Sequence, residues 1–172
     1  SGAVGCNSSA SRIRMRAAQP VAGQRFEDAS WSAPHDVKLT QPGYVIWHMD
    51  VIELPGRQGY LAIMADHAST TTCSSSDLWI ALSSDGVAWH TFAVPVLWRA
   101  MASAKRLGSR TWYRAALRYD LATDSLHIWP SALNADNRWV IFHTAVNLTD
   151  LVRVLLAATA VDEPAAQLRV AS

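Results

Sequence analysis

From about Tyr44 onward, short apolar runs alternate with polar turns, and this pattern predicts a mostly β protein. The first run, "YVIWHMDVIEL", is followed by the turn "PGRQG" and by a second run, "YLAIMAD". Two later runs, "DLWIALS" and "VAWHTFAVPVL", flank Ser84-Asp85-Gly86, and Asp-Gly between apolar runs is a strong hairpin signal. Three more runs follow: "TWYRAALRYD", "SLHIWPSAL" and "RWVIFHTAV". The turns "LATD" and "NADN" separate them.

The two ends of the chain differ from this pattern. Residues 1–30 read as a loosely organised segment, and residues 31–172 as the β domain. The segment "LTDLVRVLLAATA" is rich in Leu, Ala and Arg, which favours a short helix, and a further strand is the alternative. For the helix, Thr149 is the expected capping residue, with Asp150 behind it.

The β domain contains an internal repeat, with one copy at about residues 44–98 and the other at about 111–146. "YLAIMAD" aligns with "YRAALRYD", "LWIALSS" with "LHIWPSA", and Trp89 with Trp139, at a spacing near 50 residues. A unit of roughly 40–50 residues with three or four strands is typical of a β-propeller blade. The fold class predicted is therefore mostly β with antiparallel propeller-type blades, a partial propeller. A β-sandwich is the alternative.

Composition excludes several classes of function. The 15 basic and 14 acidic residues leave a net charge of +1 with no basic stripe, which argues against nucleic acid as the partner. The apolar runs are of strand length and interrupted, so no membrane span is expected. Cys6 and Cys73 make neither a disulfide framework nor a Cys/His cluster, so we expect no metal and no other cofactor. The sequence does not fix the compartment, and a secreted or cell-surface location stays open.

Two polar residues, His48 and Asp50, interrupt the first apolar run. They are two residues apart, so on a strand their side chains point to the same side. Burying an imidazole and a carboxylate on one face is costly unless they are paired or in contact with water. We therefore expect this face to look onto a polar partner or a wet space.

Three segments together resemble the later blades of five-bladed propellers: "WHMDV" from Trp47, "LWIALSSDGVAW" from Leu78, and "WYRAALRYD…LHIWPSA…RWVIFHT". These propellers belong to the glycoside hydrolases of the arabinanase, xylosidase and invertase type and to bacterial and phage relatives labelled sialidase-like. The turn S-x-D-G-x-x-W, ending at Trp89, is similar to one that recurs in them. The resemblance runs from Trp31 to Val146.

The resemblance implies that "VIWHMDV" is an innermost strand lining a funnel where sugar binds. His48 and Asp50 would face that funnel, Arg114 of the next blade would point to the same axis, and Trp47 or Trp31 would supply a stacking surface. The alternative is structural, with an Asp50–Arg114 ion pair tying two blades together. A closed ring of this type needs more blades than this chain holds. The chain is thus part of a longer protein, a self-associating dimer, or a sandwich.

Glycoside hydrolysis normally needs two carboxylates flanking the bond. Asp50 is the candidate catalytic residue, and Glu53, three residues on, points to the opposite face of a regular strand. Glu27 and Glu163 lie in the least organised regions. Whether the chain is an enzyme is therefore open. The leading hypothesis is a carbohydrate-binding or degenerate glycoside-hydrolase-like module with a glycan or small sugar as partner. The alternatives are a hydrolase completed by another chain or a missing segment, and a structural or protein-interaction β module.

Overall fold

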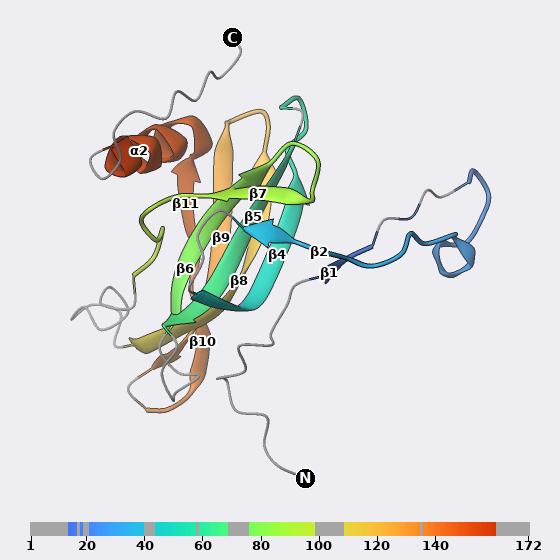
Figure 1. The fold of residues 1–172 in the computed structure, drawn as a ribbon. Coiled ribbons are helices and arrows are strands. Elements are labelled where there is room, and N and C mark those ends of the chain that lie inside the picture. The colour runs from blue at the N-terminus through green and yellow to red at the C-terminus, as the bar shows by residue number, and fades with distance from the viewer. Residues whose placement is uncertain are drawn as a thin grey trace.

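Nine of the described strands are hydrogen-bonded into one sheet, which consists of two antiparallel meanders packed against each other (Figure 1). The computed structural model describes residues 14–16, 18, 21–39, 44–57, 59–68, 76–98, 109–134 and 136–160. Within these residues the chain is mostly β, as the sequence predicts, with a single α-helix and one short 3-10 turn. Cys6, Cys73 and Glu163 lie outside them.

The first meander contains four strands, each antiparallel to the one before it. They are β4 (Tyr44–Glu53), β5 (Tyr60–Ala68), β6 (Ser76–Ser83) and β7 (Ala88–Thr91). A two-residue strand, β3 (Lys38–Leu39), adds to β7 in the parallel direction. Ahead of it, β1 (Arg14–Met15) pairs with β2 (His35–Asp36), and the 3-10 turn η1 (Phe26–Asp28) lies between them. The segment around η1 extends away from the meanders (Figure 1), whereas Met15 of β1 lies beside Gly86 in the turn between β6 and β7.

The second meander is built on two long strands, β8 (Ser109–Asp120) and β9 (Ser125–Asn134). Two short strands, β10 (Trp139–Ile141) and β11 (Thr144–Asn147), pair in succession with the other edge of β9. The helix α2 (Leu148–Ala160) follows directly. Strand β8 lies against β4 and β5. Among the described residues, Ser76–Trp112 is the one strand pair between the meanders, so side-chain packing holds them together.

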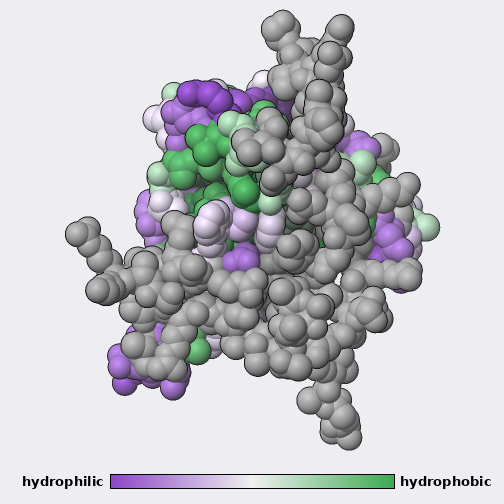
Figure 2. Space-filling view, turned by 60° about the vertical axis from the view of Figure 1, so that its left-hand side comes forward, coloured by the Kyte–Doolittle hydropathy of each residue, from purple (hydrophilic) through white to green (hydrophobic). Residues whose placement is uncertain are grey.

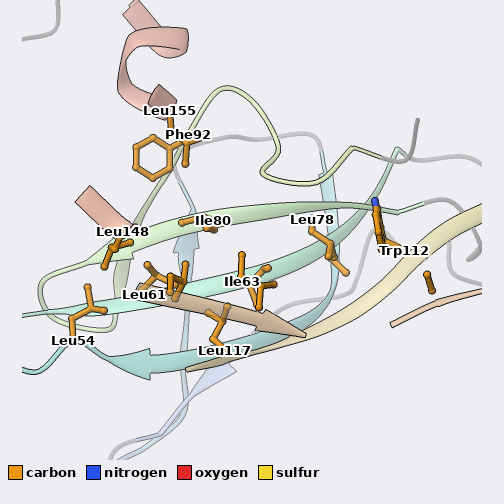
Figure 3. Close-up of a cluster of buried hydrophobic side chains, with 14 residues drawn as sticks. Leu54, Leu61, Ile63, Leu78, Ile80, Phe92, Trp112, Leu117, Leu148 and Leu155 are labelled. Carbon is orange, nitrogen blue, oxygen red and sulfur yellow. The ribbon is translucent and has the colours of Figure 1, made fainter. Parts of the chain in front are cut away.

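A shared hydrophobic core fills the space between the meanders (Figure 3). Alternation along β5 sends Leu61 and Ile63 into this core and Ala62 and Met64 to the opposite face, so both faces of the strand are buried. The core residues come from both meanders and from α2: Leu54, Leu61, Ile63, Ala65, Leu78, Ile80, Phe92, Trp112, Leu117, Leu126, Ile128, Ala132, Leu148 and Leu155. The described residues form no closed ring of blades.

The hairpin predicted at Ser84-Asp85-Gly86 is confirmed. One carboxylate oxygen of Asp85 accepts the backbone N–H groups of Val87 (2.8 Å) and Ala88 (2.9 Å). These two bonds hold the pKa of the Asp85 carboxyl below its ordinary value, and the bond from the Ala88 N–H contributes most. Gly86 has φ +74°, a left-handed conformation that favours glycine.

The helix predicted at the C-terminal end is also present, but its cap is not Thr149. The side-chain oxygen of Asn147 accepts the Asp150 N–H at 2.9 Å, so Asn147, the last residue of β11, is the capping residue. Asp124 supports the same helix end, since its carbonyl accepts the Leu148 N–H at 2.8 Å. The chain enters the helix straight from a strand, and this shifts the cap by two residues.

The Asp124 carboxylate joins three distant segments. One oxygen accepts Arg57 Nη2 at 2.7 Å and the Tyr119 hydroxyl at 2.8 Å. The other accepts the Thr149 hydroxyl at 2.6 Å and the Thr149 N–H at 3.3 Å. The Thr149 hydroxyl bond is the largest cause of a lowered Asp124 pKa, whereas burial raises the pKa of Tyr119. This Asp124 hub ties the β4–β5 turn, the β8–β9 turn and the start of α2 together.

Candidate functional site

A hollow of about 390 Å³ opens where β4 passes β8, and three of the sequence-predicted site residues line it. His48 and Asp50 come from β4 and Arg114 from β8, so both residues of the β4 pair face the same space, as their spacing predicts. Strands β9 and β10 complete the wall with Trp129, Ser131 and Ile141; Met49, Ala115 and Ala116 fill the remainder.

Asp50 is bound to backbone and not to Arg114. Its Oδ2 accepts the N–H of Leu117 at 2.7 Å, across the gap between β4 and β8. The predicted alternative, an Asp50–Arg114 ion pair, is wrong: the described residues contain no such pair. The N–H of Leu117 points away from β9, so without the carboxylate it would lack a strand partner. Asp50 thus ties the meanders together and still lines the hollow.

Two β-bulges set the directions of the lining side chains. In β4 the register shifts between Ile46 and His48, which leaves Trp47 as the extra residue. In β8 it shifts between Trp112 and Ala115. A bulge disturbs the alternation of side chains and is common beside functional sites. Trp112 before this second bulge and Leu117 after it are both in the core.

The bulge in β8 lies opposite Pro130 of β9, which pairs with Ala115 at the end of the bulge. Pro130 is buried, and its carbonyl accepts the Phe142 N–H at 2.9 Å, so the side of Pro130 that lacks an N–H faces the β10–β11 edge and not β8. The Arg114 carbonyl accepts the Ser131 hydroxyl at 3.1 Å. Because of the bulge, Tyr113 is half-buried and Arg114 is exposed on the outer face of the meander.

Trp129 is the aromatic side chain of the hollow, and two imidazoles hold its ring. The centroid of its ring lies 5.0 Å from that of His143 and 5.7 Å from that of His127, with the planes within 23° and 18° of parallel. His127 Nδ1 and His143 Nε2 are 3.0 Å apart in rings only 6° from parallel, so one nitrogen donates a hydrogen bond to the other. The bonded pair therefore lies on one side of the indole, and this orients Trp129 toward the hollow.

Trp129 is a site residue that the sequence did not predict, whereas Trp31 and Trp47 were predicted. Trp31 forms an isolated bridge with Ala18 in the N-terminal part and does not line the hollow, so its predicted stacking role there is wrong. The backbone of Trp47 is in β4, but its side chain lies outside the described part of the structure. The signal that could have found Trp129 is its place in "HIWPS", directly before Pro130, because a proline inside a strand marks a point where the strand pairing is interrupted.

The chemistry available in the hollow is recognition by hydrogen bonding, stacking and positive charge. Asp50 is the one carboxylate among the lining residues, and Glu53 is exposed on the strand's other side. The described residues contain no group of three or more His, Cys, Asp or Glu side chains placed to hold a metal ion. No described helix is both long and apolar enough to cross a membrane.

A second hollow, of about 450 Å³, lies between α2 and the first meander. It is lined mainly by apolar side chains, and none of the sequence-predicted site residues reaches it. On the side of the molecule where α2 lies, hydrophobic side chains gather next to hydrophilic ones at the surface (Figure 2). The sequence-predicted polar residues and Trp129 all line the β4–β8 hollow, which is therefore the better candidate site.

No protein-family model matches the sequence, and no curated protein matches it either. Among solved structures, the chain is similar to an N-acetylgalactosamine deacetylase from F. plautii, determined in complex with blood group B trisaccharide. The TM-score is 0.56 at 22% identity over 73% of this chain. The match shows a shared fold. The chain spans 40% of the length of that deacetylase chain.

Proposed function

We propose that this protein is a glycan-binding β module that holds a sugar in the β4–β8 hollow. The observation that carries the proposal is the meeting of Trp129 with Asp50, His48 and Arg114 around one space. An aromatic ring face packs against the apolar face of a sugar, while carboxylate, imidazole and guanidinium groups bond its hydroxyls. A concave site of a few hundred Å³ with few polar groups is typical of small-ligand sites.

We further propose that the two meanders are propeller-type blades related to the arabinanase-type glycoside hydrolases. The support is the order of strands within each meander, together with the position of β4 and β8, the first strands of the two units, side by side. The similar solved structure is that of a carbohydrate-active protein in complex with a trisaccharide, which is in keeping with this origin. A dimer that completes the ring belongs to the same proposal.

Binding without hydrolysis fits the hollow best because glycoside hydrolysis normally needs a pair of carboxylates. Asp50 stands alone among the lining residues, and one of its oxygens is already bonded to Leu117. A hydrolase completed by groups outside this hollow is the competing function. A hydrolase would cleave aryl glycosides, and Asp50→Asn would abolish this cleavage. A binding module would cleave none of them.

The test is a sugar-binding panel read by saturation-transfer NMR and calorimetry at millimolar concentration. It should include arabinose, xylose, galactose, N-acetylgalactosamine and their short oligosaccharides. Trp129→Ala should lower the affinity for the bound sugar at least tenfold. The matched control is Trp98→Ala, which removes a half-exposed tryptophan that does not line the hollow. Equal affinity in both variants, or no binding across the panel, would refute the proposal.

A further inference from the structure

Two arginines on the outer face of β8 have no acidic partner in the part of the chain that the structure describes. Arg114 and Arg118 are both exposed, and neither guanidinium takes part in an ion pair or a side-chain hydrogen bond there. They are four residues apart on a strand, which places them on the same face about 13 Å from each other. A guanidinium stays charged at any pH at which the protein is folded.

Trp129 lies between these two arginines on the same face. Strand pairing sets Trp129 opposite Ala116 and His127 opposite Arg118, so the order along the face is Arg114, Trp129, Arg118. Ala116 between the arginines is too small to cover the neighbouring indole. The indole therefore lies between two positive charges, with the His127 imidazole stacked on it at the level of Arg118.

The one carboxylate lining the hollow does little to neutralise this face. Asp50 is half-buried, and its Oδ2 is directed at the Leu117 N–H. The net charge of +1 for the whole chain gives no sign of this arrangement. Arg114 and Arg118 thus form a short positive strip that only the folded strand reveals.

We propose that the ligand of this face is an acidic oligosaccharide, whose sugar ring lies on Trp129 and whose carboxylates pair with Arg114 and Arg118. This inference rests on the proposed glycan-binding function and names its ligand class. A guanidinium binds a carboxylate or sulfate through two parallel hydrogen bonds, which a neutral sugar cannot offer. The distance between the arginines exceeds one sugar ring, so a chain fits this face better than a monosaccharide does.

The test compares acidic hexasaccharides with the same chains after methyl esterification, which removes the charge and keeps the backbone. The probes are oligogalacturonate, oligomannuronate and a hyaluronan hexasaccharide, measured by calorimetry at low and at physiological salt. At low salt at least one acidic chain is expected to bind about tenfold more tightly than its ester, and salt should reduce this ratio. Arg118→Gln should lower the affinity for the acidic chain about fivefold, with partial recovery in Arg118→Lys.

Arg153→Gln is the matched control, because Arg153 is an exposed arginine on α2 that pairs with Asp150. It should leave the affinity for the acidic chain unchanged. If the esters bind as tightly as the acids, the acidic ligand class is wrong while glycan binding stands. If none of these chains binds but neutral sugars of the panel do, the same conclusion follows. Tighter binding of single-stranded oligothymidylate than of any acidic hexasaccharide would overturn the assignment in favour of nucleic acid.

Discussion

Replacing Asp124 with asparagine tests whether the Asp124 hub holds the fold together. The change keeps the size of the side chain, and asparagine tolerates the left-handed backbone at this position (φ +50°) as well as aspartate does. It removes the charge and turns one of two acceptor oxygens into a donor NH2. That NH2 must then face either Arg57 and the Tyr119 hydroxyl or the hydroxyl and N–H of Thr149, and in each pair one member, Arg57 or the Thr149 N–H, can only donate.

The expected loss follows from this count. At least one of the four hydrogen bonds is lost, and the bonds to the remaining oxygen become bonds to a neutral acceptor. Bonds to a charged group contribute about 1.5–3 kcal/mol each when buried. The Asp124 side chain is 24% exposed, which places each bond at the low end of that range. We therefore expect a loss of about 2–3 kcal/mol in the free energy of unfolding, or a fall in Tm of about 4–12 °C.

The measurement is urea unfolding at pH 7, followed by tryptophan fluorescence and checked by thermal circular dichroism. Asp120→Asn is the control, because the Asp120 side chain accepts a bond from the Ala122 N–H in an exposed turn. It should cost less than about 1 kcal/mol. A loss below about 0.5 kcal/mol in Asp124→Asn would refute the reasoning.

The pH dependence gives a second check on the same variant. The pKa of Asp124 is lowered in the folded protein, and the hydrogen bond from the Thr149 hydroxyl is the largest cause. A carboxyl with a lowered pKa stabilises the fold above its unfolded pKa, and this contribution is lost as the pH falls through the folded pKa. The difference between wild type and Asp124→Asn should therefore be full at pH 7 and should shrink in acid below the ordinary aspartate range.

Four further measurements test other parts of the structure. Gly59→Ala should cost about 2–4 kcal/mol in the free energy of unfolding in urea, because its Cβ would lie 2.7 Å from the Ser83 carbonyl oxygen. Gly86→Ala should cost about 1–2 kcal/mol from the positive φ of Gly86 alone, and equal losses in the two variants would contradict this reasoning. Leu148→Ala, at a fully buried core position, should cost about 2–5 kcal/mol in the same assay, and a smaller loss would mean that α2 is not docked as described. Asp85→Asn should become closer to wild type in stability as the pH falls through the lowered pKa of Asp85, since that carboxylate stabilises its turn only when ionised. Light scattering at several concentrations should give the mass of a dimer, and a monomer at every concentration would remove the closed-ring proposal.

Local patterns in the sequence predicted much of the fold. Runs of apolar residues separated by turn residues located the long strands, and the period of two placed His48 and Asp50 on one face. The helix after Asn147 followed from its composition, but its cap did not, because the cap depends on the strand that precedes it. Short-range rules succeed where neighbours in sequence set the conformation.

The candidate site could be predicted only in part, because it depends on register and on long-range contacts. The bulge opposite Pro130 turns Arg114 to the outer face. A pattern that alternates every two residues cannot predict such an extra residue. Trp129 becomes part of the hollow through β10 and β4, and the bond between Asp50 and Leu117 joins residues 67 positions apart. Trp31 was expected at the site because of its residue type, and its pairing with Ala18 places it elsewhere.

The bond between Asp50 and the Leu117 N–H has a consequence for solubility. A strand edge with unpaired N–H groups is a template on which another chain can add a strand, and such addition starts aggregates. On the β4-facing edge of β8 a negatively charged side chain occupies the place that a carbonyl of an incoming strand would take. A carboxylate repels a second backbone carbonyl and cannot extend the ladder, so Asp50 ends the sheet at this point. Variants that remove it should be judged by their tendency to precipitate as well as by their binding.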